Sequence, residues 1–147
     1  MKRVLSAVFI CIIACLGLQA AKVDTVMVHS KSMNKDIKVV TIRPDKAMEG
    51  EKCPTIYLLH GHDGYAEYWM RIRPDLPQIA DREGIIFVCP DGGHDSWYWD
   101  SPVVDSNRYE TFISKELVEY ADNSLNTIAD RSKRAITGLS MGGHGAM

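Results

Sequence analysis

The chain contains 147 residues, of which 46% are hydrophobic and 24% charged, and its formal net charge is −2. This composition is typical of a globular protein with one core, and the chain contains no low-complexity segment and no repeat of solenoid period. The chain also has no basic patch, so we do not expect nucleic acid as a partner.

The first 20 residues have the pattern of a cleaved export signal. Lys2 and Arg3 precede an apolar run from 4 to 18, and Ala20 ends an acceptable cleavage site. The run is short for a membrane span, so we expect an exported protein, periplasmic or secreted, with no stable membrane span after cleavage. The residues before Cys15 also resemble a lipobox, which leaves a lipoprotein as one alternative and an uncleaved anchor as another.

The next segments predict the start of a sheet. Residues 23–29 and part of 36–42 alternate with period two, which indicates two half-buried antiparallel strands at one edge. Residues 44–52 are polar and predict a loop. Residues 55–59 form a continuous apolar run, typical of a strand buried on both faces, and a glycine-rich loop follows from His60.

Helices and strands alternate in the second half of the chain. A short helix is predicted over 75–82, with Gly84 behind it, and a second buried strand over 85–89. An aromatic loop, 94–106, leads to the best predicted helix, 107–121, in which Asn107 and Glu110 resemble a capping box. A polar stretch then precedes a short strand, which we expect to be buried, over 135–137.

This alternation predicts a mainly parallel sheet flanked by helices. Ligands bind at the carboxyl ends of the strands in such sheets, so the loops 60–62, 90–92 and 138–140 should meet at one edge. Cys53 precedes one parallel strand and Cys89 ends its neighbour, which places them roughly 15 Å apart or more. A disulfide needs Cα atoms within about 7 Å, so both cysteines should be free.

The stretch Gly138-Leu139-Ser140-Met141-Gly142 fits the G-x-S-x-G nucleophile elbow. In this motif a serine on a sharp strand-to-helix turn has strained dihedrals and an exposed hydroxyl, and the glycines avoid collisions with neighbouring backbone. Ser140 is therefore the predicted nucleophile, and the backbone N–H of Met141 the first oxyanion donor. The second donor should come from the loop after 55–59, most plausibly the N–H of His62.

A serine nucleophile needs a base, and in this topology an acid and then a histidine follow the serine. We expect both beyond Met147. The histidines present are poor candidates: His60 and His62 belong to a loop with a backbone role, His29 is an expected surface residue, His144 has an expected packing role, and His94 could line a pocket.

Further residues near the expected site have less specific roles. Trp97, Tyr98 and Trp99 either cap the sheet edge or contact an acyl or aromatic group of a substrate. Asp91 and Asp100 are predicted turn formers. The chain has no C-x-x-C pair and no His/Cys cluster at metal-ligand spacing, so no metal and no cofactor are expected.

Taken in order, several short segments resemble the esterase D-like "putative esterase" family of α/β-hydrolases from about residue 25 to the end. This resemblance implies a truncated α/β-hydrolase fold that stops after the nucleophile elbow, in which residues 21–147 are the N-terminal part of a single domain. Ser140 matches the family's nucleophile, and Met141 and His62 match its oxyanion-hole positions. The segments that carry it are Tyr57-Leu58-Leu59-His60-Gly61, Pro90-Asp91-Gly92, Trp97-Tyr98, Asp100-Ser101, Tyr109-Glu110-Thr111-Phe112 and Gly138-Leu139-Ser140-Met141-Gly142-Gly143.

The family includes feruloyl, acetyl-xylan and tributyrin-type esterases, S-formylglutathione hydrolases and mycolyltransferases. The resemblance implies an exported serine carboxylesterase acting on short acyl or aromatic esters, small or linked to polysaccharide. The alternatives are an acyltransferase to a sugar hydroxyl, a thioesterase similar to S-formylglutathione hydrolase, or a non-catalytic binding protein on the same fold. Without residues beyond Met147, we expect the chain alone to be inactive.

Overall fold

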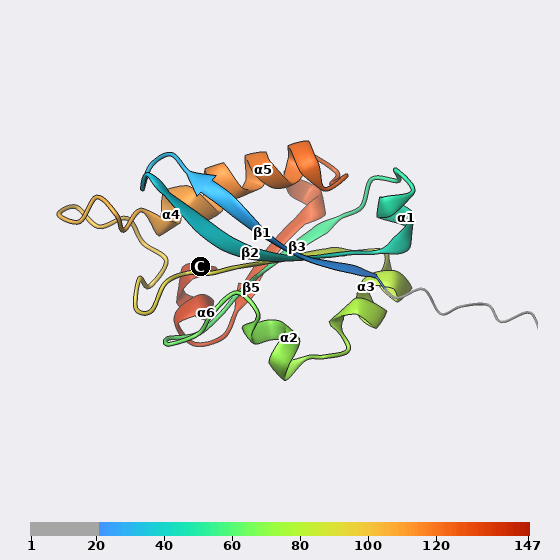
Figure 1. Cartoon of the computed structure of the whole chain (residues 1–147), viewed down its shortest axis with the longest axis horizontal. Helices are drawn as coiled ribbons and strands as arrows, with labels where there is room; N and C mark the ends of the chain where they lie inside the picture. Colours follow the sequence, from blue (N-terminus) through green and yellow to red (C-terminus); the bar gives the residue numbers. More distant parts are fainter. Residues whose placement is uncertain (1–20) are drawn as a thin grey trace, which may run out of the picture.

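A computed structural model describes residues 21–147, so the expected export signal and Cys15 lie outside the described residues (Figure 1). Five strands form one mixed sheet in the order β1-β2-β4-β3-β5. The strands are β1 (Lys22–Ser30), β2 (Lys35–Arg43), β3 (Thr55–Leu59), β4 (Ile86–Pro90) and β5 (Arg134–Gly138).

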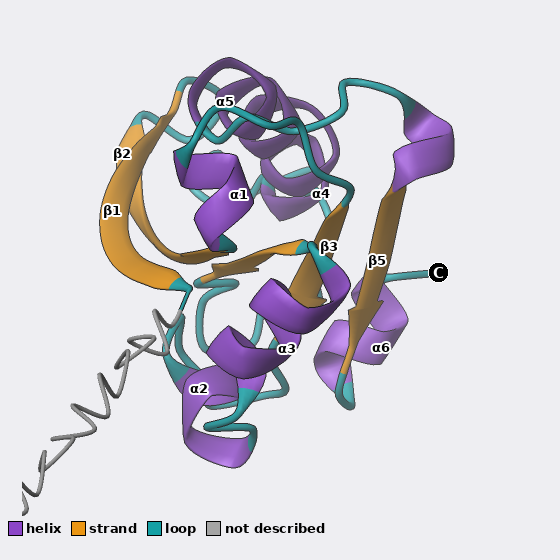
Figure 2. Cartoon of the chain, turned by 90° about the vertical axis from the view of Figure 1, so that its right-hand side faces the viewer, coloured by secondary structure: helices purple, strands orange, loops and turns teal. Residues whose placement is uncertain are grey.

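Helices cover both faces of this sheet, as Figure 2 shows. One face carries α1 (Asp45–Met48), α4 (Tyr109–Thr111), the π-helical segment η1 (Phe112–Glu116) and α5 (Leu117–Ser124). The other carries α2 (Tyr68–Ile72) and α3 (Leu76–Glu83). The short η2 (Arg131–Lys133) precedes β5, and α6 (Met141–Gly145) follows it.

The two N-terminal strands form the predicted antiparallel edge. Val26 of β1 is paired with Val39 of β2. β2 then pairs antiparallel with β4, which in turn is parallel to β3. The parallel part of the sheet is thus β4-β3-β5, while β1 and β2 add an antiparallel extension.

The apolar runs predicted at 55–59 and 85–89 form the centre of the protein. Tyr57 and Leu59 face the cluster that includes Phe112 and Leu117, whereas Leu58 faces the cluster that includes Ala80 of α3. Successive side chains of a strand point to opposite faces, so a strand covered on both faces must be apolar throughout. This explains why these two segments show no alternation.

The prediction of a buried strand at 135–137 is wrong. Residues 135–137 are all exposed, and the Ile136 side chain is 40% exposed. Within the described part of the chain, β5 pairs with β3 alone and lies at the edge of the sheet, where the helices over the inner strands leave it uncovered.

The long helix predicted at 107–121 starts later and is less regular. Its N-cap residue is Arg108, which makes no side-chain capping bond, so the capping box expected from Asn107 and Glu110 is wrong. Instead, the Asp100 carboxylate accepts hydrogen bonds from the N–H (3.0 Å) and Oγ1 (2.6 Å) of Thr111. Asp100 is thus a cap contributed by the aromatic loop and was not foreseen as one.

Two further differences are local. The loop predicted at 44–52 contains α1, and α2 was not predicted at all, because both helices are short and lack a clear apolar period. In contrast, α3 follows its prediction closely and ends at Gly84, which has the left-handed conformation expected there (φ 64°).

The cysteines agree with the predicted topology. Cys53 and Cys89 are both buried and free. No helix within residues 21–147 has the length and apolar character needed to cross a bilayer.

The connections of β3 and β4 leave in opposite directions. The chain after β3 passes to α2 and α3 on one face, while the chain after β4 passes to α4 and α5 on the other (Figure 2). Such a reversal opens a crevice at the carboxyl ends of the strands, where ligands of open α/β sheets bind. The candidate site is therefore expected among the loops that follow β3, β4 and β5.

Candidate active site

Ser140 occupies the turn between β5 and α6 in an unusual backbone conformation. Its φ is 54° and its ψ is −115°, a combination that L-residues rarely adopt. Ser140 is exposed, whereas the next residue, Met141, is fully buried. The turn thus presents the Ser140 hydroxyl to solvent at the carboxyl edge of the sheet.

The glycines around Ser140 are required by close backbone packing. A Cβ on Gly142 would collide with the carbonyl oxygens of Leu59 and His60, and a Cβ on Gly138 would collide with the backbone of Gly142. The predicted steric reason for these glycines is confirmed. In addition, the Leu139 N–H donates to the Leu59 carbonyl (3.2 Å), so the turn is attached to the end of β3.

The loop after β3 lies directly against the serine turn. A Cβ on Gly61 would lie 3.2 Å from the Leu139 carbonyl oxygen and 3.5 Å from the Ser140 Cβ. Gly61 therefore packs closely against the serine turn, and His62, the predicted second oxyanion donor, is the residue that follows it. Its side chain is exposed and points away to a different set of partners.

His60 joins the loops after β3 and β4. Its ring is 1% exposed; Nδ1 lies 2.7 Å from the Gly61 carbonyl oxygen, and Nε2 accepts a 2.7 Å hydrogen bond from the Gly92 N–H. Since an N–H points at Nε2, the proton must be on Nδ1, and the ring is neutral. Sequence reasoning expected only a backbone role for this loop and missed the bridge, which joins residues 32 positions apart.

Tyr98 supports the same region from the aromatic loop. Its side chain is buried and its hydroxyl donates to the His60 carbonyl (3.2 Å). Burial raises the pKa of the Tyr98 phenol far above its ordinary value, so the hydroxyl remains a donor. A Cβ on Gly92 or Gly145 would collide with this ring, which explains both glycines.

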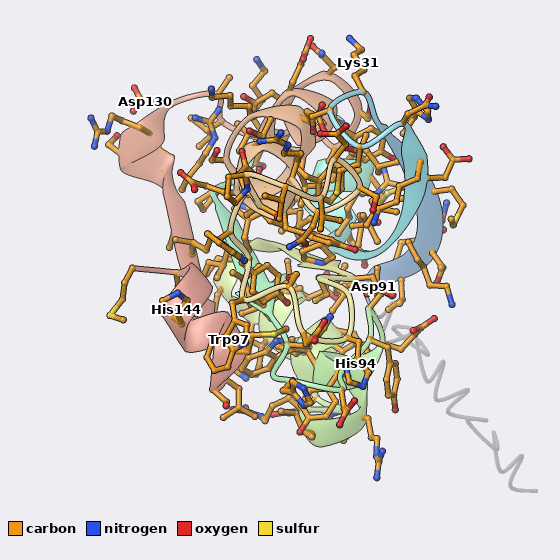
Figure 3. All side chains as sticks on the ribbon, turned by 90° about the vertical axis from the view of Figure 1, so that its left-hand side faces the viewer. Lys31, Asp91, His94, Trp97, Asp130 and His144 are labelled. Carbon is orange, nitrogen blue, oxygen red and sulfur yellow. The ribbon has the colours of Figure 1, made fainter. Side chains whose placement is uncertain are left out.

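Trp97 and Trp99, in contrast, are each 49% exposed. Together with Tyr98 and His144 they line an open pocket of about 310 Å³ beside α6. The Trp97 and His144 rings are 5.6 Å apart in an edge-to-face arrangement, and Figure 3 shows the two side chains together. This contact agrees with the packing role expected of His144.

The two aspartates predicted as turn formers differ. Asp91 accepts a hydrogen bond from the Gly93 N–H (2.8 Å), as a turn former does. Burial disfavours its charge, but the hydrogen bond from the Gly93 N–H and the positive charge of Lys38 hold the pKa of Asp91 below its ordinary value. Asp100 instead caps α4, as described above.

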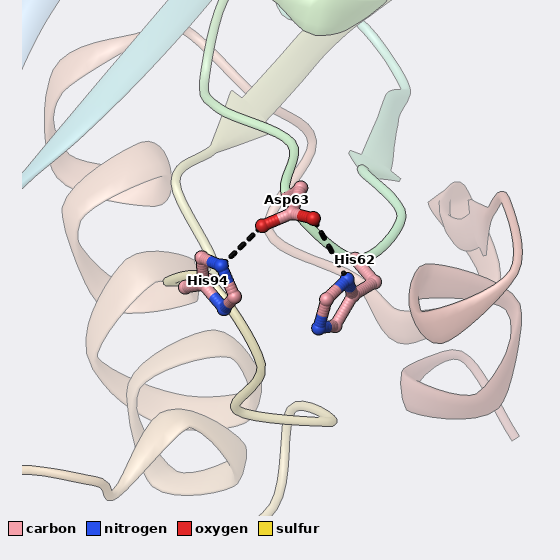
Figure 4. A group of neighbouring side chains, drawn as sticks. All are labelled: His62, Asp63 and His94. Carbon is pink, nitrogen blue, oxygen red and sulfur yellow. Dashed lines mark ion pairs between the residues drawn. The ribbon is translucent and has the colours of Figure 1, made fainter.

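Three exposed side chains at this edge form a cluster that the sequence did not suggest. The Asp63 carboxylate lies between two imidazoles and pairs with His62 Nδ1 (3.2 Å) and with His94 Nε2 (Figure 4). The two rings are 4.7 Å apart between centroids. His62 follows β3 and His94 follows β4, so the cluster marks the crevice between those strands.

Within residues 21–147, the histidines have partners other than Ser140. His144 contacts Trp97, His60 bonds to Gly61 and Gly92, and His62 and His94 both contact Asp63. His29 is exposed on β1 and bonds to Asp36. The described residues thus place a strained, exposed serine beside a glycine-rich loop, and within them no histidine side chain is bonded to the Ser140 hydroxyl; His144 bonds to Ser140 only through its backbone N–H.

Comparisons with known proteins find esterases among the relatives of this chain. The family model described as "Putative esterase" matches residues 30–147. An esterase of Mycobacterium tuberculosis is 32% identical over 110 residues, which are 74% of this chain and 24% of that protein. An acetyl esterase of Caldicellulosiruptor saccharolyticus is 28% identical over 127 residues, which are 81% of this chain and 47% of the relative.

A solved structure described as a ferulic acid esterase superposes with a TM-score of 0.74 and 33% identity. The superposition covers 86% of this chain and 51% of that one. The α/β-hydrolase fold expected from the sequence is thereby confirmed. The chain spans at most about half of the length of these relatives.

Proposed function

The chain belongs to the "Putative esterase" family, and from this premise we propose that it acts as a serine carboxylesterase on short-chain acyl or aromatic esters, such as acetyl and feruloyl esters. The observation that carries the proposal is the backbone of Ser140, which is strained and exposed between β5 and α6. Strain of this kind persists only where the surrounding structure enforces it, and it is concentrated at functional sites. Here Gly138 and Gly142 provide that enforcement by packing against the end of β3.

In the proposed reaction, the Ser140 Oγ attacks the ester carbonyl carbon and its proton passes to a general base. The carbonyl oxygen becomes an oxyanion, which accepts hydrogen bonds from the N–H groups of Met141 and His62. The C–O bond to the alcohol breaks, the alcohol leaves with the proton, and water then hydrolyses the acyl-enzyme. Removal of one oxyanion donor lowers kcat by about 10²–10³-fold in a well-built serine hydrolase.

The general base and its acid are proposed to lie outside residues 21–147. This proposal rests on the partners of the described histidines, which are all occupied elsewhere. Residues 21–147 would then be the N-terminal part of a single esterase domain that is inactive alone. A serine hydrolase without its triad retains roughly 10³–10⁴-fold over water from the oxyanion hole and binding.

The pocket beside α6, the helix that begins directly after Ser140, favours esters with an apolar or aromatic group. Its half-exposed Trp97 and Trp99 offer flat apolar surfaces, which suit an acyl chain or an aromatic ring. Transfer of the acyl group to a sugar hydroxyl, or hydrolysis of a thioester, would use the same serine and remains an alternative. A non-catalytic binding protein on this fold would have no use for the strained Ser140.

The test is hydrolysis of p-nitrophenyl acetate and p-nitrophenyl butyrate, together with labelling by a fluorophosphonate, in this chain and in a version that continues through a complete esterase domain. We expect activity and labelling in the longer protein, and both should disappear in Ser140→Ala. Ser132→Ala, an exposed serine in η2, is the matched control. Labelling that persists in Ser140→Ala would contradict the assignment of the nucleophile. Fast turnover by the short chain that is lost on changing one of its own histidines would contradict the location of the base.

Export is proposed from residues 1–20, which lie outside the described residues. N-terminal sequencing of the protein from its natural host should begin at Ala21. A lipid-modified Cys15 at the N-terminus would indicate the lipoprotein alternative, and an intact Met1 in the cytoplasm would contradict export altogether.

A further inference from the structure

The cluster of His62, Asp63 and His94 has the composition of a metal site. The three residues offer two imidazole nitrogens and a carboxylate oxygen, and their ligand atoms all lie within 4.8 Å of one another. Figure 4 shows one ring paired with each end of the Asp63 carboxylate, and both rings lie below the carboxylate in that view. All three side chains are exposed, so a dissolved ion can reach them.

Backbone contacts hold the two loops at this spacing. The Asp63 N–H donates to the His94 carbonyl oxygen (3.0 Å), which joins the loop after β3 directly to the loop after β4. The Gly64 N–H donates to the Gly61 carbonyl (3.0 Å) and closes the turn, in which Asp63 has a φ of 59°. The main chain therefore places the three residues side by side at this edge of the sheet.

The distances are close to those of a coordinated ion. Zinc binds histidine nitrogen at about 2.0–2.1 Å and carboxylate oxygen at about 2.0–2.2 Å in tetrahedral geometry, so two ligands of one ion are roughly 3.3–3.5 Å apart. Because the three ligand atoms lie within 4.8 Å of one another, shifts of at most about 1.5 Å would bring all three onto one ion. Side chains this exposed can rotate that far without disturbing the core.

The ligand set also selects the class of ion. Imidazole suits zinc, copper and nickel, whereas magnesium and calcium prefer oxygen ligands alone. Two imidazoles and one carboxylate are also a known ligand set of zinc, in which a fourth position stays open to water or a ligand. Without an ion, the same atoms would simply form the hydrogen-bonded cluster that the structure shows.

We propose that His62, Asp63 and His94 bind one divalent transition-metal ion of the zinc class at the crevice between β3 and β4. The ion would cross-link the loops that follow these strands, and its open coordination position would face solvent. Since one ligand is the side chain of His62, the ion would also restrain the loop after β3, in which Gly61 packs against the serine turn. The inference concerns metal binding and does not depend on the proposed esterase activity.

The experiment is a calorimetric titration of the chelator-treated chain with ZnCl₂, and separately with MgCl₂, in a buffer that does not bind metal. We expect one saturable zinc site per chain and no magnesium binding. His94→Gln should weaken zinc binding by more than about tenfold, since changes even outside the coordination shell alter affinity by roughly 10–100-fold. Asp63→Asn should do the same, and Asn is well suited to a left-handed backbone, so this second variant preserves the turn.

His29→Gln is the matched control. His29 and Asp36 form an exposed pair at 2.8 Å that resembles half of the proposed site but lacks a third ligand. This variant should bind zinc as the parent does, and circular dichroism should show that all variants are folded. The proposal is overturned if the parent shows no saturable zinc binding, if His94→Gln and Asp63→Asn bind as tightly as the parent, or if His29→Gln weakens binding equally.

Discussion

Replacing His60 by leucine tests the bridge between the loops after β3 and β4. The change removes the donor to the Gly61 carbonyl and the acceptor for the Gly92 N–H, both at 2.7 Å, and both glycines are buried. The Gly92 N–H loses its partner, which costs about 1–3 kcal/mol, whereas the Gly61 carbonyl keeps its bond from the Gly64 N–H and loses only about 0.5–1.5 kcal/mol, so the total is roughly 1.5–4.5 kcal/mol. Burial of the apolar leucine side chain offsets part of this loss.

We therefore expect His60→Leu to lower the free energy of unfolding by about 1–3 kcal/mol, a substantial share of the 5–15 kcal/mol typical of a folded domain. The assay is urea unfolding followed by tryptophan fluorescence. Trp69 is a suitable reporter because its Nε1 donates to the Leu59 carbonyl, next to His60. An unchanged m-value, the slope of the unfolding free energy against urea concentration, would show that the variant alters stability and not the surface exposed on unfolding.

Two conservative variants divide the effect between the two hydrogen bonds. His60→Asn keeps a donor near the position of Nδ1, and His60→Gln can keep an acceptor near Nε2, so each should lose less than His60→Leu. His29→Leu, at an exposed position of β1, should change stability by less than about 1 kcal/mol. A loss below about 0.5 kcal/mol in His60→Leu, or equal losses in all three His60 variants, would refute the bridging role.

Two further predictions concern buried groups. Among residues 21–147 the buried Tyr57 hydroxyl has no hydrogen-bond partner, so Tyr57→Phe should raise the unfolding free energy at pH 7 by about 1 kcal/mol. Burial, with the charge of Asp122, raises the pKa of Tyr57 to about 12 from 10.0. Because the folded pKa exceeds the unfolded one, the contribution of the neutral phenol to stability is complete below pH 10 and is lost as the pH rises towards 12. This loss should be absent from the pH profile of Tyr57→Phe, and identical alkaline profiles of the two proteins would contradict this reasoning. Burial likewise raises the pKa of the Cys89 thiol to about 12 and that of Cys53 above its ordinary value. Iodoacetamide should therefore modify both thiols only after denaturation, and no reductant should be needed. A linked Cys53–Cys89 peptide in the mass spectrum would show that the strand order is wrong.

The sequence by itself determined the central strands and the serine turn. The apolar runs that became β3 and β4 have no alternation because both faces of each strand are covered. Gly138 and Gly142 flank Ser140 because main chains meet there without room for a Cβ. These features are local consequences of burial and close packing, so they leave a pattern within a few residues that can be recognised without the structure.

Only the tertiary structure decided the contacts between distant loops. The Asp100 cap on Thr111 replaced the capping box expected from neighbouring residues, since a carboxylate from another loop can satisfy the same N–H groups. The exposure of β5 depends on which strands and helices lie beside it, and its own apolar residues do not reveal that.

The His60 bridge and the cluster around Asp63 have the same origin. Each joins residues about thirty positions apart, and those residues meet because parallel strands end at the same edge of the sheet. A linear pattern shows the spacing of residues along one segment, whereas hydrogen-bond partners and metal ligands are chosen by distance in space. The roles of His60, His62 and His94 could therefore be assigned only once the strands were paired.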